Sequence, residues 1–268
     1  MNWVELVKTL VMGAVEGITE FLPISSTGHL IITGDVIHFS GEMADTFEIV
    51  IQLGAILAVC WLYREKLLTV TRTLGSDRRS QGFVLNLFVA FLPAAIVGLA
   101  LHKYITEYLF NPVTVAIALI VGGIAMLLIE QRHIMPRIDD VDRLDWRDAL
   151  KVGCAQTLAL FPGVSRSGAT IMGGVVFGLS RQTATEFSFF LAIPTMFAAT
   201  LYELAKHLDQ FHAADVQVFA VGFVMSFLSA LVAVKGFIRY VSHHDFAVFG
   251  WYRIVFGAIV LWYFWPAA

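Results

Sequence analysis

Two short stretches of the sequence place ionisable and hydroxyl side chains among apolar residues. Residues 16–29 read Glu-Gly-Ile-Thr-Glu-Phe-Leu-Pro-Ile-Ser-Ser-Thr-Gly-His, and residues 161–170 read Phe-Pro-Gly-Val-Ser-Arg-Ser-Gly-Ala-Thr. At membrane depth, which the hydropathy described below indicates, an ionisable side chain costs about 2.5–3.5 kcal/mol on insertion scales. A chain that keeps two glutamates, a histidine and an arginine in such surroundings is therefore expected to use them.

Prolines interrupt both stretches and hydroxyl side chains follow, a pattern typical of a helix that breaks and starts again. The N-terminus of a helix exposes unpaired N–H groups and the positive end of the helix dipole, and both favour phosphate. Two such N-termini that face each other would form a cradle for an anion. The serines could instead serve only as N-caps, an ordinary role for serine at a helix start. The hydroxyls at these predicted helix starts are those of Ser25, Ser26, Thr27, Ser165 and Ser167.

Arg166 adds a cation to the second stretch. Its guanidinium presents a planar fork of donors that matches phosphate oxygens. When the chain is aligned on itself, Arg166 occupies the position of Ser26, so the two stretches differ at the predicted site. Arg166 could also pair with Glu16 or Glu20 for structure alone, and the two roles are compatible.

Glu16 and Glu20 are four residues apart, so on a helix they share a face. Two carboxylates this close in a low dielectric repel each other strongly, and they need Arg166, a shared proton or a divalent cation. Mg²⁺ or Ca²⁺ takes oxygen ligands and commonly joins carboxylates to substrate phosphates. Such an ion also stabilises the charge that develops on a leaving phosphate. We therefore predict that Glu16 and Glu20 bind Mg²⁺ or Ca²⁺, and the alternative is that they orient His29.

His29 is the only one of the eight histidines that the sequence places near the middle of the membrane. It follows Ser26 by one helical turn, which is within reach of a hydrogen bond. The imidazole could take the proton of the Ser26 hydroxyl or attack phosphorus itself. The sequence leaves the nucleophile open between these two residues. A buried histidine that only satisfies its hydrogen bonds is the structural alternative.

The composition indicates that helices crossing a membrane position these residues. The chain of 268 residues is 58% hydrophobic and 15% charged, against about 25% charged in a soluble protein, and its mean hydropathy is +0.75. Each of six apolar stretches approaches the length of about 20 residues that a helix needs to cross the hydrocarbon core. We predict an all-α polytopic membrane protein. The stretches are residues 46–63, 83–101, 113–129, 187–205, 216–238 and 246–265.

The sequence also repeats one plan, which predicts two halves within a single membrane domain of residues 1–268. A phenylalanine follows Gly28 and Gly168 at the same distance, and other residues match in the same register. Chance similarity between apolar helices is the alternative. The first half covers about residues 1–131 and the second about residues 145–268.

Each half is predicted to begin with a re-entrant hairpin and to continue with three spans. Proline removes a backbone donor and disfavours helix at the residue before it. Non-helical backbone at membrane depth survives only where it is buried or lines a wet cavity. Three crossings per half give the halves opposite orientations, the inverted-repeat plan of many transporters. The hairpin arms are residues 3–21 and 25–38, broken at Pro23, and residues 147–160 and 165–178, broken at Pro162-Gly163.

Lysine and arginine set the predicted orientation. They gather in the segments 64–82 and 131–151, and few lie on the opposite side. Loops rich in these residues stay cytoplasmic. The first hairpin is therefore predicted to face outward, and the second to enter from the cytoplasm.

Together the two stretches resemble the undecaprenyl-diphosphate phosphatase family of bacterial membranes, the bacitracin-resistance type, over essentially the whole chain. The first family motif, Glu-x-x-x-Glu followed by Pro-x-Ser-Ser-x-Gly-His, is present from Glu16 to His29, and the second, Pro-Gly-x-Ser-Arg-Ser-x-x-Thr, from Pro162 to Thr170. The resemblance implies hydrolysis of undecaprenyl diphosphate to undecaprenyl phosphate and inorganic phosphate, which recycles the lipid carrier of peptidoglycan synthesis and confers bacitracin resistance. It also implies a divalent-metal requirement, location in the bacterial inner membrane and an active site that opens to the periplasm.

The predicted site combines both stretches. We expect Ser26, activated by His29, to attack the terminal phosphorus while Arg166 and a divalent cation stabilise charge. The expected partners are undecaprenyl diphosphate and membrane lipid, without nucleic acid, and a homodimer is left open. Predicted catalytic residues are Ser26, His29, Glu16, Glu20 and Arg166, and predicted substrate-binding residues are Ser25, Thr27, Ser165, Arg166, Ser167, Gly168 and Thr170.

Two other classes of protein fit parts of the pattern. A polyprenyl-phosphate transporter or flippase would use the same anion site but needs no nucleophile, so phosphate release by Ser26 and His29 variants separates the two classes. An intramembrane serine protease would use the Gly-x-Ser-x pattern of residues 163–166, but it needs a histidine on a later span, and residues 187–265 offer none at mid-depth. The sequence leaves open the roles of Glu48, Gln52, Glu186 and Arg253.

Overall fold

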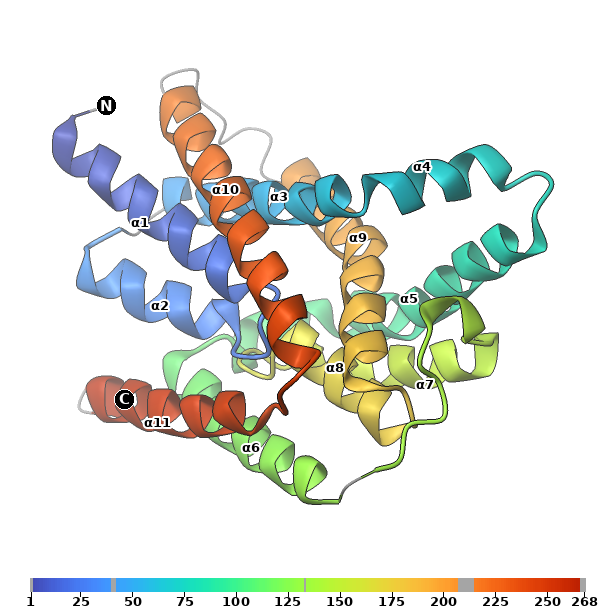
Figure 1. The fold of residues 1–268 in the computed structure, drawn as a ribbon. Helices are drawn as coiled ribbons and strands as arrows, with labels where there is room; N and C mark the ends of the chain where they lie inside the picture. The colour runs from blue at the N-terminus through green and yellow to red at the C-terminus, as the bar shows by residue number, and fades with distance from the viewer. Residues whose placement is uncertain (1, 40–41, 133, 207–214, 266–268) are drawn as a thin grey trace.

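The computed structural model describes residues 2–39, 42–132, 134–206 and 215–265, and over these residues the chain forms helices and no strand (Figure 1). Two shorter helices and three longer ones follow one another, and the same order then recurs, except that the first series contains one more short helix, α4 (Arg64–Thr73). In chain order the helices are α1 (Trp3–Thr19), α2 (Ser26–Val36), α3 (Glu42–Leu62), α4 (Arg64–Thr73), α5 (Arg78–Tyr104), α6 (Pro112–Gln131), α7 (Trp146–Gln156), α8 (Arg166–Val176), α9 (Arg181–Lys206), α10 (Val216–Val241) and α11 (Ala247–Phe264).

The predicted spans are confirmed as helices. Within the described residues, five helices (α5, α6, α9, α10 and α11) are long and apolar enough to cross a membrane. The sixth predicted stretch corresponds to α3, which is joined to α4 at a bend of 74° and counts as a span only if the bent pair is one broken span. The protein is therefore an all-α, multi-pass membrane protein, as the sequence predicts.

The segment 64–82 differs from the expected loop, because most of it is helical. α4 occupies its first part, and α5 begins at Arg78, ahead of the apolar stretch that starts at residue 83. Asp77 explains the early start, since its carboxylate accepts a hydrogen bond of 3.0 Å from the backbone N–H of Ser80. A carboxylate in this position caps a helix.

The long helices pack in a pattern that the two halves share. α1 packs along α10, α7 packs along α5, and α6 packs against α11. Small residues allow the backbones to approach closely: a Cβ on Gly13 would lie 2.6 Å from the carbonyl oxygen of Gly222, and a Cβ on its repeat equivalent Gly153 would lie 2.4 Å from that of Ala90. In both cases the first helix of one predicted half packs on a long helix of the other half, which supports the two-half plan. The boundaries of the halves and their orientation in a membrane stay predictions.

Both predicted hairpins are present, and their turns share an unusual backbone. The hairpin of α1 and α2 turns just before Ser26, and the hairpin of α7 and α8 turns just before Arg166. The residue at each turn's end is a serine with positive φ, 68° at Ser25 and 75° at Ser165. A non-glycine residue rarely adopts this conformation, so its recurrence at positions that the predicted repeat makes equivalent is consistent with that repeat and with a site at the two turns.

Candidate active site

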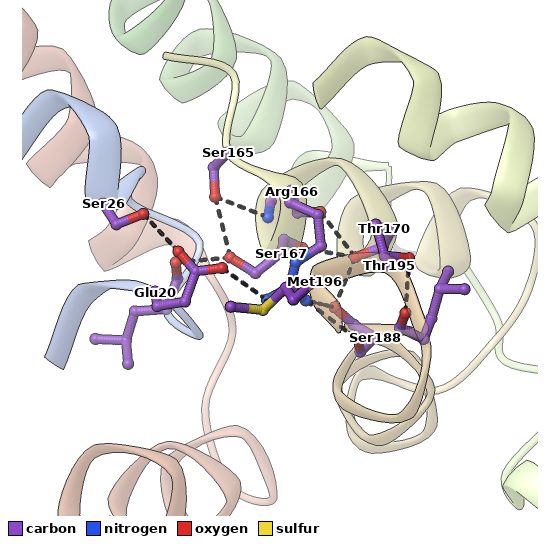
Figure 2. Close-up of polar contacts among 12 residues, drawn as sticks. Glu20, Ser26, Ser165, Arg166, Ser167, Thr170, Ser188, Thr195 and Met196 are labelled. Atoms are coloured by element: carbon purple, nitrogen blue, oxygen red, sulfur yellow. Dashed lines mark hydrogen bonds and ion pairs between the residues drawn. The ribbon is translucent and has the colours of Figure 1, made fainter. Parts of the chain in front are cut away.

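The two hairpin turns meet in the interior of the protein, and polar side chains join them (Figure 2). Ser167 donates a hydrogen bond of 2.8 Å to the carbonyl oxygen of Leu22, across the two halves. Arg166 and Glu20 form an ion pair of 3.1 Å, with side chains only 13% and 10% exposed. The structure therefore brings together the two stretches that the sequence singles out.

Glu20 lies between a hydroxyl and a guanidinium. Its Oε2 accepts a hydrogen bond of 2.5 Å from Ser26 Oγ, and its Oε1 accepts one of 3.1 Å from Arg166 Nη2. Phe21, the next residue, packs edge-on against Phe189 with ring centroids 5.5 Å apart, which anchors the end of α1 in the apolar core. A carboxylate held in this way can take a proton from the Ser26 hydroxyl.

Arg166 is held on its other side by α9. Its Nη1 donates to the carbonyl oxygen of Ser188 at 3.2 Å and to its hydroxyl at 3.4 Å. Thr170 shares a hydrogen bond of 2.6 Å with the same hydroxyl and donates back to the carbonyl of Arg166 at 2.9 Å. The Arg166 Nε is buried and has no hydrogen-bond partner among the described residues. One donor of the fork is thus available to an anion.

The hydroxyls of the second turn serve structure more than the sequence suggests. Ser165 Oγ accepts from the backbone N–H of Gly168 at 3.1 Å and lies 3.0 Å from Ser167 Oγ. Ser165 is therefore an N-cap, the alternative that the sequence left open. Its described contacts include no histidine, so they give no support to a serine protease. In the first turn, Ser25 makes no side-chain cap, and Thr27 is half-buried in the first turn of α2.

His29 does not make the expected hydrogen bond to Ser26. Its Nδ1 lies 2.7 Å from the carbonyl oxygen of Ser25, and its Nε2 lies 2.6 Å from Tyr252 Oη. Because a carbonyl only accepts, Nδ1 carries the proton and Nε2 accepts from Tyr252. The ring also stacks on Phe256 at 4.1 Å between centroids. The reason for the difference is direction, since the imidazole points toward α11 while Ser26 points toward α1.

Glu16 is the least satisfied polar group of the site. The residue is fully buried, and neither carboxylate oxygen has a hydrogen-bond partner among the described residues. Charges on Glu20 and Glu48 repel a charge on Glu16, and Arg166 attracts it. A buried carboxylate without a partner is costly, so this position needs a proton or a cation.

The donor set fits a divalent cation in its chemistry. Carboxylate oxygens are the ligands that Mg²⁺ and Ca²⁺ prefer, and the oxygens of Glu16 are uncommitted. Over the residues that the structure describes, no group of three acidic, histidine or cysteine side chains surrounds a common point. A cation held by Glu16 and Glu20 would therefore need further oxygen ligands that are not side chains of these types, and the oxygens of a phosphate could supply them.

Arg253 is the residue whose role the sequence did not reveal. It is 1% exposed and donates hydrogen bonds to the backbones of both turns, at 3.1 Å to Pro23 and at 3.0 Å to Gly163. An arginine inside an apolar stretch was visible in the sequence, but its partners were not. Ser188 and Tyr252 gave no signal, because each lies inside an apolar stretch and outside both motifs.

The other residues left open by the sequence lie outside these contacts or at their edge. Glu48 acts on Glu16 electrostatically. Glu186 accepts a hydrogen bond of 3.1 Å from Gln182, one turn earlier on α9. Gln52 lies half-buried on α3.

An apolar groove lies beside the second turn, between α6, α7 and α8. Its volume is about 490 Å³. Val164, Gly168 and Arg253 are among its lining residues, together with Ala125 and Met172. The groove thus shares part of its wall with the turn that carries Arg166.

Comparison with known proteins agrees with these features. The family model described as bacitracin resistance protein BacA matches residues 9–259. An undecaprenyl-diphosphatase of Nitrosospira multiformis is 61% identical over 97% of this chain and 96% of its own length. Proteins of the same name from Nitrosomonas europaea, at 59% identity over 97% of this chain and 95% of the relative, and from Laribacter hongkongensis, at 58% over 99% and 97%, are similarly close. The chain belongs to the bacitracin resistance protein BacA family.

Proposed function

We propose that this protein hydrolyses undecaprenyl diphosphate to undecaprenyl phosphate and inorganic phosphate. The observation that carries the proposal is the contact of Ser26, Glu20 and Arg166, which joins a hydroxyl, an acid and a cation from the two hairpins. Relatives that share at least 58% identity over nearly the full chain carry the name undecaprenyl-diphosphatase. By this reaction the protein would recycle the lipid carrier of the cell wall and confer bacitracin resistance.

The proposed chemistry begins with binding of the terminal phosphate between the N-termini of α2 and α8. Both helix starts offer backbone N–H groups and positive dipole ends, and Arg166 adds a formal charge. Ser26 Oγ attacks the terminal phosphorus while its proton passes to Glu20, which already accepts its hydrogen bond at 2.5 Å. The bond from phosphorus to the bridging oxygen breaks, and the lipid monophosphate leaves. Water then hydrolyses the phosphoserine to release inorganic phosphate and the Ser26 hydroxyl.

A second version makes His29 the nucleophile. Its Nε2 would have to lose the hydrogen bond to Tyr252 before it could attack. The structure therefore favours Ser26, which is already paired with a base. Trapping the phosphorylated protein and identifying the modified residue by mass spectrometry decides between them, since phosphohistidine contradicts the Ser26 version.

We further propose that Glu16 and Glu20 bind a divalent cation, Mg²⁺ or Ca²⁺. When bound, the ion would supply positive charge to the diphosphate and would satisfy the two unpartnered oxygens of Glu16. The groove beside the second turn would hold the beginning of the isoprenoid tail, because its lining is apolar and it adjoins the turn. We place the protein in the inner membrane with the site open to the periplasm, from the distribution of lysine and arginine.

The proposal is tested by phosphate release from purified protein supplied with the C55 diphosphate. Wild-type protein is expected to release phosphate, and a chelator or Arg166→Ala is expected to abolish most of the release. A transporter built on the same hairpins needs no nucleophile, so it would bind the lipid and release no phosphate. Absence of release from the wild type in the presence of Mg²⁺ or Ca²⁺ would overturn the proposed reaction.

A further inference from the structure

Arg253 of α11 connects the two hairpin turns through their backbones. Its three shortest hydrogen bonds go to the carbonyl oxygens of Val164 at 2.9 Å, Gly163 at 3.0 Å and Pro23 at 3.1 Å. Two longer contacts of 3.4 Å reach carbonyl oxygens of α6 at Leu119 and Ala118. All the nitrogens of one guanidinium are therefore committed to main-chain oxygens of three segments.

The charge of Arg253 is not matched by an acid. The residue is 1% exposed, and no ion pair within the described parts of the chain includes it. Buried charges in proteins are normally paired with an opposite charge or coordinate a metal, and at membrane depth an arginine is especially costly. The five neutral carbonyl oxygens around Arg253 do not neutralise its charge. We therefore expect that the protein retains this costly residue for the geometry that the five hydrogen bonds impose on the backbone.

Two glycines make room for the guanidinium. A Cβ on Gly122 would lie 2.3 Å from Arg253 Nη2, and a Cβ on Gly168 would lie 3.0 Å from Nη1. The first distance is shorter than any real contact of a Cβ atom. Gly122 on α6 thus leaves room for the guanidinium that reaches the turns.

The bound carbonyls lie just before the reactive groups. Pro23 comes three residues before Ser26, and Gly163 comes three residues before Arg166, on the matching turn. Between them lie Ser25 and Ser165, the serines with positive φ. A change in the spacing of the two turns would move Ser26 away from the guanidinium of Arg166.

We propose that Arg253 is a positioning residue, which holds the two hairpin turns at the spacing where Ser26, Glu20 and Arg166 meet. It acts through the main chain of both turns and contacts none of the three side chains. Because a displacement of about 1 Å in a catalytic arrangement can cost about 100-fold in rate, loss of the connection lowers kcat more than it raises KM. The kinetic part of this inference rests on the proposed phosphatase reaction.

The first test measures the spacing of the turns and needs no activity. Spin labels are placed on Ile18 and Leu158, exposed residues of the two hairpins, in a chain whose free cysteines Cys60 and Cys154 are replaced by alanine. Electron–electron double resonance is expected to give a narrow distance distribution for wild type, a broad one for Arg253→Met and an intermediate one for Arg253→Lys. A distribution for Arg253→Met that equals the wild-type one would overturn the proposal.

The second test measures kcat and KM for the C55 diphosphate. Arg253→Met is expected to lower kcat by about 100-fold with KM changed less than about threefold, and Arg253→Lys to recover part of the loss. Arg143→Met, which removes an exposed arginine of a surface ion pair, is the matched control and is expected to keep wild-type kinetics. Equal kinetics for Arg253→Met and wild type contradict the proposal, whereas an inactive wild type contradicts the proposed reaction and leaves the distance test valid.

Gly122→Ala is the second variant, because Arg253→Met could fail to fold. It keeps the charge and the donors of Arg253 but places a methyl group against Nη2. We expect a broadened distance distribution and a fall in kcat of about tenfold. The effect is smaller than that of Arg253→Met because the guanidinium is displaced but still present. A narrow distribution with wild-type kcat in folded Gly122→Ala would overturn the proposal.

Discussion

The hairpin of α1 and α2 and the hairpin of α7 and α8 have the same backbone at their turns and different side chains. Ser25 and Ser165 end the turns with φ of 68° and 75°. After the first comes Ser26, and after the second comes Arg166, although the two positions correspond. The shared backbone supplies two opposed helix N-termini, which suit any phosphate. The divergence divides the chemistry, with the nucleophile and acids on one hairpin and the cation on the other.

The helices behind the hairpins can be matched in the same way. α6 and α11 cross so that a Cβ on Gly123 would lie 2.6 Å from the Gly250 carbonyl oxygen, and a Cβ on Gly257 would lie 2.9 Å from that of Ala116. If a two-fold axis exchanges α6 and α11, each of these two contacts maps onto the other. Gly123 then corresponds to Gly257, and Ala116 corresponds to Gly250. With the same offset in residue number, and so in the same register, Tyr252 and Phe256 of α11 correspond to Ala118 and Gly122 of α6.

This register explains why only the second hairpin borders the groove. In the first half, the rings of His29, Tyr252 and Phe256 stack on one another and fill the space between α2 and α11. Small residues at the matching positions leave that space open in the second half, where they line the groove. These matching residues are Ala169, Ala118 and Gly122.

Removing the nucleophile from the first hairpin is expected to have the largest effect. Ser26→Ala should lower kcat by about 10⁴-fold or more, as loss of a nucleophile does in other hydrolases, with little change in KM. Ser242→Ala, at an exposed position after α10, is the control and should leave kcat unchanged. If Ser26→Ala kept more than a tenth of the wild-type kcat, the division of roles between the hairpins would be wrong, and His29 would be the remaining candidate.

Removing one acid from the first hairpin should weaken the response to metal. Glu16 corresponds to the neutral Gln156 of the second hairpin, so Glu16→Gln makes the two hairpins alike at this position. Mg²⁺ or Ca²⁺ is expected to raise the melting temperature of the wild type, because a ligand that binds the folded state stabilises it. Glu16→Gln should need at least roughly tenfold more metal for the same shift, because it lacks one of the charged oxygen ligands. A metal response equal to that of the wild type would exclude Glu16 as a ligand.

Filling the groove beside the second hairpin should weaken binding of the isoprenoid tail. Ala125→Phe adds a ring to the groove lining and leaves the turns untouched. We expect KM for the C55 diphosphate and for a C15 diphosphate to rise by about five- to tenfold, the equivalent of about 1–1.4 kcal/mol of lost apolar contact, because both chains begin with the isoprenoid units that the groove would hold. The comparison variant is Ile117→Phe, on the exposed part of α6 outside the groove. A KM for the C55 diphosphate equal to that of the wild type would show that the tail lies elsewhere.

Much of this arrangement is predictable from the sequence. Hydropathy locates the long helices, and Pro23 and Pro162 locate the turns. The pairing of an acid with Arg166 follows from the cost of isolated charges in a membrane. The direction of His29 does not follow, because it depends on a positive φ at the preceding turn and on rings of α11. The contacts of Arg253 are equally hidden, since they end on backbone oxygens, which every residue has.

The smallest predicted effect concerns how each hairpin is fixed at its outer end. A local capping box of Asn2 and Glu5 starts α1. In the first hairpin, Lys8 of α1 also donates a hydrogen bond of 2.9 Å to the carbonyl oxygen of His38 after α2. In the second hairpin the anchor includes an ion pair, because Arg137 bonds both Asp148 of α7 and the carbonyl oxygen of Phe177 after α8, the latter at 3.0 Å. Arg137→Gln should therefore loosen the second hairpin and lower the melting temperature by about 2–4 °C.

The pH dependence of this effect follows from Asp148. Burial raises the pKa of Asp148, but hydrogen bonds from Arg137 and Lys151 outweigh burial and hold the pKa below its ordinary value of 3.8. A carboxyl whose pKa is lower in the folded than in the unfolded state contributes stability above the unfolded pKa, and the contribution is lost as pH falls through the folded pKa. The difference in melting temperature between wild type and Arg137→Gln should thus be full at pH 7 and shrink below about pH 4. Arg143→Gln, which breaks an exposed pair with Asp139, should shift the melting temperature by less than about 1 °C. A pH-independent difference for Arg137→Gln would mean that the arginine acts through Phe177 alone.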